Sequence, residues 1–363
     1  MVNDGNKCID LIVDGIDGVT GPIRVAVTLG YFLRLRSYRV TLVTPYVNSS
    51  VKHEIQGLNI IELIGKPTLS GQLGHLWLWI RNAFREVVYR SDCITINLSF
   101  ELPIPSTIFY AQGYVGDLLK DMTETAPMHY RLGYLLASPL IKAANMVYHK
   151  GIVNSRFVVA NSRFTADMVR SRGITVSDII HPPINTNFFK PVENPGEDYV
   201  LTYVGKETEF KVLKALADNG IKIVAFGSKV PWLPKWFTRH SMIDYKGRVS
   251  DDELVKLYAN AKFTVFPFTH EPFGYVPVES MACGTPVLTY NKQGPAETVI
   301  NNETGWLVNN PSELVDRALR IWNNGYPNIM RIKARERALN YSEDLIMRRW
   351  LNLVSTKLTP SLP

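Results

Sequence analysis

Short apolar runs alternate with amphipathic segments at the start of the chain. Residues 8–16 and 38–45 are apolar and contain many β-branched side chains, which is typical of strands buried on both faces of a parallel sheet. Between them, Val25, Leu29 and Leu33 recur at helical spacing. Strand, helix and strand in this order predict a βαβ unit with a right-handed crossover.

The alternation continues until a proline-rich segment interrupts it. Further strands are predicted within residues 59–65, 92–99, 106–112 and 156–162. Residues 181–199 then carry Pro182, Pro183, Pro191 and Pro195, which predict a linker. A chain of 363 residues is also long for a single core. We therefore predict a first domain over residues 1–190.

A second α/β series follows the linker. Its strands are predicted within residues 199–205, 221–227, 242–248, 263–268 and 286–291. Residues 250–261 predict a helix, with Ser250 as N-cap and Glu253 completing a capping box. After Pro311 the pattern is helical, with no further strand candidate. We predict a second domain over residues 191–342 and a last helix, 343–363, that can pack back on the first domain.

The composition is that of a folded protein with an excess of positive charge. Hydrophobic residues make up 46% of the chain and charged residues 20%, with a formal net charge of +7. This charge favours anionic partners such as nucleotide phosphates, acidic lipid surfaces or nucleic acid. Because Lys and Arg are spread over both halves and no recognised nucleic-acid module occurs, we predict no nucleic-acid partner.

The cysteines and the N-terminus bear on the compartment. Cys8, Cys93 and Cys283 form no CxxC pair and no even, regular framework, so neither a disulfide scaffold nor a zinc site is predicted. The first residues do not resemble a secretory signal, and no apolar run is long enough to span a bilayer. We expect a cytoplasmic protein in a reducing environment. Peripheral association with the cytoplasmic face of a membrane is an open alternative.

One amphipathic segment, residues 73–90, has two interpretations. Its apolar side chains recur at helical spacing and three arginines lie between them: Leu73, Leu76, Trp77, Ile80, Phe84 and Val87, with Arg81, Arg85 and Arg90. Such a helix could lie on an anionic membrane and deliver a lipid-linked acceptor. The pattern is generic for a helix that faces a protein core, and we favour that interpretation.

The stretch "EPFGYVPVESMACGTPVL", Glu271 to Leu288, carries the strongest functional signal. Two glutamates eight positions apart are common by chance. In this context, however, the stretch resembles the donor-binding signature of retaining GT-B glycosyltransferases, in particular glycosyltransferase family 4. Other segments in order along the chain resemble the same family: "VVANSRFTADMVR", "IIHPPINTNFFKP", "KGRVSDDELVKLYANAKFTVFP" and "GPAETVINNETGWLV". The resemblance implies two Rossmann-like domains, the first for the acceptor and the second for a nucleotide-sugar donor.

The resemblance also implies roles for single residues. Glu279, which would open the helix "PVESMA", is expected to accept hydrogen bonds from a ribose diol, and Glu271 from hexose hydroxyls. Gly274 would let backbone amides approach the sugar and phosphates. The other implied donor-binding residues are Phe273, Gly205, Gly21 and Arg248. Without the surrounding match, both glutamates would be interpreted as helix-terminal or solvated charges.

Two lysines are the expected phosphate ligands. Lys206 and Lys211 follow a predicted strand at positions where the family usually has an arginine and then a lysine. Replacing the guanidinium fork by an ammonium keeps the charge but loses bidentate geometry. The alternative is a solvated helix start.

The glycine loop of the first domain also departs from the family pattern. Thr20 and then Gly21 stand where the family commonly has two glycines, while Arg24 matches a frequent basic residue. The loop could lay backbone amides near the donor phosphates.

Gln112 falls where related enzymes often carry a histidine. Glutamine can form hydrogen bonds but cannot titrate, so a front-face mechanism assisted by the donor phosphate is favoured. No Asp-x-Asp pair occurs, and we expect no metal and no other cofactor. The predicted reaction is retaining, metal-independent transfer of a hexose to a hydroxyl acceptor. The alternatives are a nucleotide-sugar epimerase of the same form and a non-catalytic sugar-binding module. Oligomeric state stays open.

Overall fold

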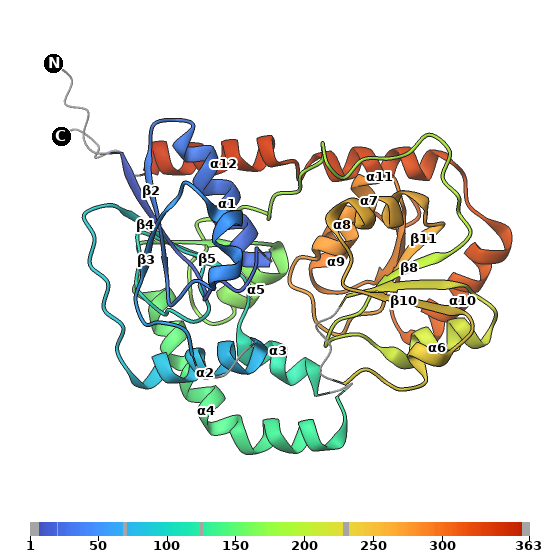
Figure 1. The fold of residues 1–363 in the computed structure, drawn as a ribbon, viewed down its shortest axis with the longest axis horizontal. Coiled ribbons are helices and arrows are strands. Elements are labelled where there is room, and N and C mark those ends of the chain that lie inside the picture. The colour runs from blue at the N-terminus through green and yellow to red at the C-terminus, as the bar shows by residue number, and fades with distance from the viewer. Residues whose placement is uncertain (1–6, 20, 68–70, 124–125, 228–231, 358–363) are drawn as a thin grey trace. The chain divides into compact units, whose positions relative to one another are not determined.

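The computed structural model describes residues 7–19, 21–67, 71–123, 126–227 and 232–357, and the chain forms two compact units (Figure 1). The first unit comprises Met1–Asp117, Leu135–Pro183 and Asp344–Pro363, and the second comprises Leu118–Tyr134 and Ile184–Glu343. The chain passes between the units at Pro183, inside the proline-rich segment, seven residues before the boundary that we predicted at 190. Residues 118–134, which we had placed in the first domain, are grouped with the second unit.

The first unit is built on a parallel sheet of order β3-β2-β1-β4-β5-β6-β7. The strands are β1 (Cys8–Ile12), β2 (Arg39–Thr44), β3 (Asn59–Glu62), β4 (Ile94–Asn97), β5 (Ile108–Ala111), β6 (Phe157–Ala160) and β7 (Asp178–Ile179). Its helices include α1 (Gly21–Arg34), α2 (Gly71–Phe84), most of α4 (Met128–Val153), α5 (Arg163–Arg170) and α12 (Glu343–Lys357), together with the 3-10 helix η1 (Ser49–Ile55); α3 (Val115–Met122) begins in this unit. Only the two-residue strand β7 was not predicted.

The last helix, α12, packs into the core of the first unit. Its buried side chains are Ile346, Met347, Trp350, Leu353 and Val354, and they share one hydrophobic cluster with α1, β1 and β2. Trp350 is fully buried, and its ring lies 5.2 Å from that of Tyr110 on β5. A tryptophan of this size removes a large apolar area from water, so α12 is an integral part of this core.

The second unit repeats the architecture with a parallel sheet of order β10-β9-β8-β11-β12-β13. Its strands are β8 (Val200–Tyr203), β9 (Ile223–Phe226), β10 (Ile243–Gly247), β11 (Phe263–Phe266), β12 (Val287–Tyr290) and β13 (Gly305–Val308). Its helices are α6 (Phe210–Asp218), α7 (Asp251–Asn260), α8 (Tyr275–Ala282), α9 (Gln293–Thr298), α10 (Pro311–Asn324) and α11 (Ile329–Leu339), with the 3-10 helix η2 (Phe237–Arg239). The Ser250 hydroxyl accepts from the Glu253 N–H, which confirms the predicted N-cap.

Strand β13 was missed because it begins with a glycine, which lowers strand propensity. The structure explains this glycine: a Cβ at Gly305 would lie 2.2 Å from the carbonyl oxygen of Val287 on the neighbouring strand. Glycine is therefore required at position 305 because the backbone of the neighbouring strand comes very close. Strand propensity alone does not reveal this constraint.

Both sheets are doubly wound, as predicted. In each, the chain adds strands to one side and then returns to the other side of the first strand, between β1 and β4 and between β8 and β11. Such reversal points leave a crevice at the carboxyl ends of the strands, where α/β proteins usually bind ligands.

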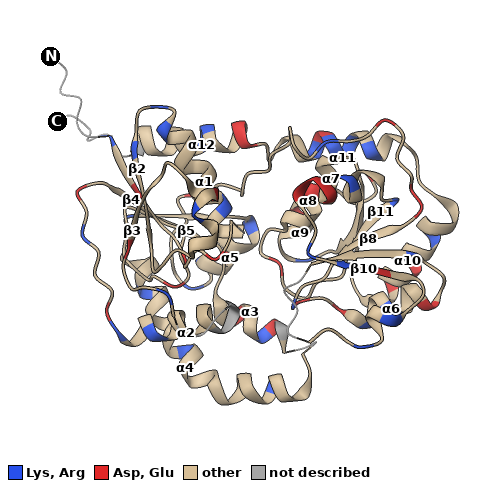
Figure 2. Ribbon diagram, viewed as in Figure 1, with Lys and Arg blue, Asp and Glu red and all other residues tan. Residues whose placement is uncertain are grey.

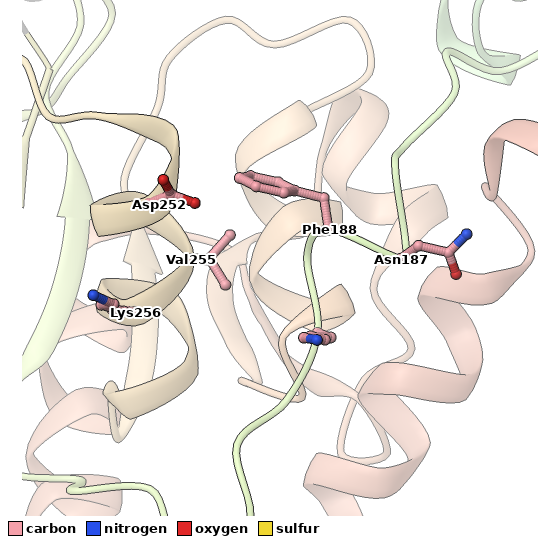
Figure 3. A pocket seen from close by; sticks show the side chains of 6 residues that line it. Asn187, Phe188, Asp252, Val255 and Lys256 are labelled. Carbon is pink, nitrogen blue, oxygen red and sulfur yellow. The ribbon is translucent and has the colours of Figure 1, made fainter.

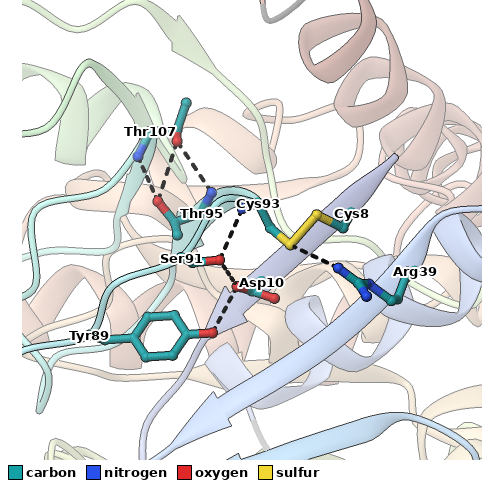
Figure 4. Close-up of a disulfide and its surroundings, with 8 residues drawn as sticks. All are labelled: Cys8, Asp10, Arg39, Tyr89, Ser91, Cys93, Thr95 and Thr107. Carbon is teal, nitrogen blue, oxygen red and sulfur yellow. Dashed lines mark hydrogen bonds between the residues drawn. A yellow bond between two sulfur atoms is a disulfide. The ribbon is translucent and has the colours of Figure 1, made fainter. Parts of the chain in front are cut away.

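One disulfide forms, which the spacing of the cysteines and the expected reducing environment did not suggest: Cys8 and Cys93 are bonded (Figure 4). Cys8 is the first residue of β1, and Cys93 directly precedes β4. The register pairs Ile9 with Ile94, which brings the two cysteines side by side with their Cα atoms 5.0 Å apart. The sequence did not suggest the pair because 85 positions separate the two residues.

Removing this disulfide is expected to destabilise the first unit. The bond closes a long loop, and the Cys8→Ser/Cys93→Ser variant should lose about 2–4 kcal/mol of unfolding free energy, measured by denaturant titration without reductant. Reductant should lower the stability of the wild type and leave that of the variant unchanged. Thiol titration of the denatured, unreduced wild type should detect Cys283 alone; three free thiols would contradict the pairing.

The predicted core-facing stripe of the segment 73–90 is correct only in part: Leu76, Ile80 and Val87 are partly buried, and Val87 packs against a buried cluster. On α2, Leu78 and Trp79 are buried, whereas Trp77 and Phe84 are exposed, and Arg81 lies over the Trp77 ring. The side chain of Leu73 is outside the described residues. Within the described part of the chain, no helix combines the length and apolar character needed to cross a membrane.

Candidate functional site

Two loops leave neighbouring strands at the reversal point of the second sheet. Residues 204–209 follow β8 and residues 267–274 follow β11. Backbone bonds join the loops: the Glu209 N–H donates to the Pro267 carbonyl at 2.9 Å, and the Thr269 N–H donates to the Glu207 carbonyl at 3.1 Å. This pairing fixes the lysine-bearing loop beside the loop that carries Glu271.

Glu271 is held by its own loop. Its carboxylate accepts from the backbone N–H of Gly274 at 3.0 Å and of Phe273 at 3.4 Å, while its own N–H donates to the Gln293 side chain. Gly274 has φ +93°, a conformation that favours glycine, and it is the N-cap of α8. Burial, and next the charge of Glu207, raise the pKa of Glu271 to about 7. This carboxyl therefore exchanges its proton near neutrality.

Glu279 is buried, with 4% of its surface exposed, but it does not open its helix as predicted. Helix α8 starts at Tyr275, before the "PV" that we took as its beginning, so Glu279 lies one turn further in. The Tyr258 hydroxyl, from α7, donates to its carboxylate at 3.2 Å. A buried carboxylate held by a neighbouring hydroxyl keeps its position and orientation, as a ligand-binding group requires.

The structure adds Tyr203 and Glu207, which the sequence analysis did not single out. Burial raises the pKa of the Tyr203 phenol, and the negative charges of Glu207, Glu271 and Glu279 raise it further. Three carboxylates thus gather near one phenol at the end of β8. Glu207 directly follows Lys206 in the chain, and the pairing of the two loops brings its charge near Glu271.

The lysines differ in setting. The Lys206 ammonium lies 3.8 Å from the Glu207 carboxylate, and its side chain is partly buried. Lys211 is exposed at the second position of α6. Any side chain at position 205 would be crowded, since a Cβ there would lie 2.9 Å from the Tyr203 ring and 3.2 Å from the Glu207 carboxylate.

Two implied donor residues of the second unit have different environments. The side chain of Phe273 is buried in a core cluster, with the rings of Tyr275 and Tyr341 5.7 Å away, so it can offer a ligand only its backbone. Arg248 is exposed directly after β10.

The implied residues of the first unit lie near its sheet. Gln112 is buried and donates to the Leu98 carbonyl at 2.8 Å, so its amide fastens β5 to the segment after β4. Gly21 is the first residue of α1 and Arg24 lies in its first turn, while Thr20 is outside the described residues.

A second polar cluster, absent from the sequence analysis, occupies the reversal point of the first sheet. Asp14 accepts from the Ser99 hydroxyl and from the N–H groups of Phe100 and Glu101, and Glu101 is paired with His75 at 2.5 Å. Burial and the charge of Asp14 raise the pKa of Glu101 to about 7, and the bond to Glu101 raises the pKa of His75. The unit thus carries an imidazole near its crevice although Gln112 is not a histidine.

His270 is a further buried residue that the sequence analysis missed. Its Nδ1 lies 2.8 Å from the carboxylate of Asp121, which belongs to the same unit, and the Gln293 amide donates to the same carboxylate at 3.4 Å. This contact ties the loop of Glu271 to the segment 118–134.

A surface hollow of the second unit lies apart from these groups (Figure 3). It has a volume of about 410 Å³ and lies between Asn187, Phe188 and Lys190 of the linker and Asp252, Val255 and Lys256 of α7. None of the residues that the sequence implied lines it. The candidate site therefore rests on the convergence of side chains and not on this hollow.

Comparison with known proteins agrees with the architecture. The family model described as "Glycosyl transferases group 1" matches residues 210–341. The chain is 25% identical over 234 residues to an uncharacterized glycosyltransferase of Methanocaldococcus jannaschii, a match that covers 61% of this chain and 65% of that protein. The chain thus spans slightly less than two thirds of the length of this curated relative.

Solved structures resemble the chain over nearly its whole length. Sucrose-phosphate synthase from Thermosynechococcus elongatus has a TM-score of 0.74 at 18% identity, covering 98% of this chain and all of that chain. The Anabaena protein HepE, solved in complex with UDP-glucose, has a TM-score of 0.67 at 15% identity, covering 96% and 99%. The chain has the GT-B fold, and its residues 210–341 match the family model of the group 1 glycosyl transferases.

Proposed function

We propose that this protein is a glycosyltransferase that moves a hexose from a nucleotide-diphosphate sugar to a hydroxyl acceptor, with retention and without a metal. The observation that carries the proposal is that the loop of Lys206 is hydrogen-bonded to the loop of Glu271 at the reversal point of the second sheet, with the buried Glu279 on the helix that follows. HepE, a protein of the same fold, binds UDP-glucose, which supports a nucleotide sugar as the donor class.

Each part of such a donor finds a group of matching chemistry. The fixed carboxylate of Glu279 suits a ribose diol, because a charged acceptor strengthens both hydrogen bonds. Glu271 suits hexose hydroxyls, and its bonds to the amides of Phe273 and Gly274 hold it in place. Lys206 and Lys211 supply the positive charge that a leaving diphosphate needs, which is electrostatic stabilisation by a preorganised site.

The nucleophile in this proposal is the acceptor hydroxyl. As the bond from the anomeric carbon to the diphosphate breaks, the electron pair leaves with the phosphate, whose oxygen takes the acceptor's proton on the same face. No Asp-x-Asp pair is available in the sequence to hold a divalent ion on the diphosphate. For this reason the proposed reaction is independent of a metal ion.

The deciding experiment measures binding and slow hydrolysis of UDP-, GDP- and ADP-sugars with and without EDTA. Selective binding that resists EDTA is expected. Binding without turnover on any acceptor would favour the non-catalytic module, and isomerised donor without acceptor would favour the epimerase. No binding of any nucleotide sugar would refute the proposal.

The two lysines should contribute to turnover. Lys206→Ala and Lys211→Ala are each expected to reduce the transfer rate about ten-fold or more, because the leaving diphosphate loses a stabilising cation. Lys214→Ala is the matched control, since Lys214 lies on the same α6 helix but pairs with Asp218. Steady-state kinetics with saturating donor measure the effect; equal rates in all three variants would remove the lysines from the mechanism.

A further inference from the structure

The outward face of α4 is apolar. Its exposed side chains include Leu132, Leu135, Leu136, Leu140 and Met146, here called the α4 face, with exposed fractions between 46% and 82%. At 3.6 residues per turn these positions fall on one side of the helix, opposite the buried Ile141, Ala144, Tyr148 and Ile152. The side of the helix that meets water therefore carries the side chains expected on the side that meets a core.

This face is more than scattered surface leucines. Single exposed apolar residues are normal on soluble proteins. A continuous row along several turns of one helix instead marks a contact surface, because its exposure to water is unfavourable. Among the described residues, these side chains are all exposed.

The charged side chains of helix α4 have one sign. Helix α4 contains no Asp or Glu over its 26 residues, and Figure 2 shows no red on it. Its cationic side chains Arg131, Lys142 and Lys150 are all exposed. In the same unit, α2 also exposes Trp77 and Phe84, with Arg81 over the Trp77 ring.

Three arrangements could account for the exposed α4 face, and these observations favour one of them. A helix that crosses a bilayer is not indicated, since α4 lacks the apolar character of a spanning segment. In a symmetric contact with a second copy, the basic side chains of both copies would be brought to the same interface, where like charges repel. A bilayer with anionic headgroups matches both the apolar row and the cations beside it.

We propose that the α4 face docks on a membrane whose lipids carry anionic headgroups, with α4 lying in the interface and Arg131, Lys142 and Lys150 at the headgroups. The leucines enter the boundary of the acyl chains. The docking goes beyond the proposed transfer reaction and does not depend on it. The first unit is thereby held at a lipid surface.

Vesicle flotation with the full chain tests the docking. Vesicles of phosphatidylcholine alone are compared with vesicles that also contain phosphatidylglycerol. The wild type should bind the anionic vesicles about ten-fold or more tightly than the neutral ones, because each basic residue near the surface favours binding. Leu135→Glu/Leu136→Glu should lose most binding to both, and Lys142→Glu/Lys150→Glu should lose the preference for phosphatidylglycerol.

The matched control is Leu35→Glu, which makes the same substitution at an 84% exposed leucine of the first unit outside α4. It should bind as the wild type does. Circular dichroism and donor binding, measured on every variant, show that each is folded. The docking is overturned if the wild type floats with neither vesicle, if the double leucine variant floats like Leu35→Glu, or if light scattering shows a dimer that Leu136→Glu dissociates.

Discussion

Glu279→Ala is expected to weaken binding of the nucleotide-sugar donor about a hundred-fold in Kd, which corresponds to about 3 kcal/mol. In the proposed complex this carboxylate accepts two hydrogen bonds from the ribose, and alanine cannot replace either. The buried position of Glu279 on α8 means that no water-exposed side chain can substitute for it. Isothermal titration calorimetry with the preferred donor measures the change.

Two further variants separate binding from packing. Tyr258→Phe removes the hydroxyl that donates to Glu279 and leaves the carboxylate in place, so a smaller loss, of about ten-fold, is expected. Glu253→Ala replaces an exposed glutamate of α7 and should leave Kd unchanged. If Glu279→Ala binds donor as the wild type does while remaining folded, Glu279 is a structural carboxylate and the proposed ribose contact is wrong.

Glu271→Gln is expected to lower the transfer rate about a hundred-fold, the size found when one preorganised polar contact to a transition state is removed. The wild-type rate should also rise with pH through about 7, because the ionised carboxylate is the better acceptor of hexose hydroxyls and burial raises its pKa to that range. The profile of Glu271→Gln should lack this rise. Rates measured from pH 5 to 9 on one donor and acceptor test both statements.

Glu207 supplies the matched control for this pH dependence. Its negative charge helps to raise the pKa of Glu271, so Glu207→Gln should move the midpoint of the wild-type profile to lower pH. Glu303→Gln, at an exposed glutamate of the same unit, should leave it in place. A midpoint that does not respond to Glu207→Gln would assign the titration to another group.

The same carboxyl has a predicted effect on stability. Its pKa is higher in the folded protein than the ordinary value of 4.5, so its contribution is fully present below 4.5 and is lost as pH rises through about 7. Wild-type unfolding free energy should therefore fall relative to that of Glu271→Gln by about 2 kcal/mol between pH 5 and 8. The protein thus holds the ionised Glu271, which the reaction uses, in an environment that disfavours it.

Most of the fold could be predicted from local patterns. The buried parallel strands β1, β2, β8 and β11 are rich in apolar and β-branched side chains, and the N-cap at Ser250 has a local signature, so short windows were sufficient. The pattern was insufficient where tertiary contacts overrode it. Trp77 and Phe84 were expected to face the core because they are apolar, yet they are exposed, and β13 begins with a glycine that a neighbouring backbone requires.

Some residues of the candidate site could likewise be predicted from the sequence, and others could not. Glu271, Gly274, Glu279 and the lysines could be named from the sequence because a stretch of ordered motif residues carries the resemblance. Glu207, Tyr203 and the pair of His75 and Glu101 could not, because each depends on strands that are neighbours in the sheet but distant in the chain.

The amino-acid sequence by itself determined the α/β class, the two-sheet organisation and the chemical groups available to a donor, since these follow from periodicity and residue type. Only the tertiary structure decided which groups meet. Sheet order brings Cys8 to Cys93 and the loop of Lys206 to that of Glu271, and helix packing leaves the leucines of α4 in water. Such contacts join residues that are far apart in the chain, and no local pattern records them.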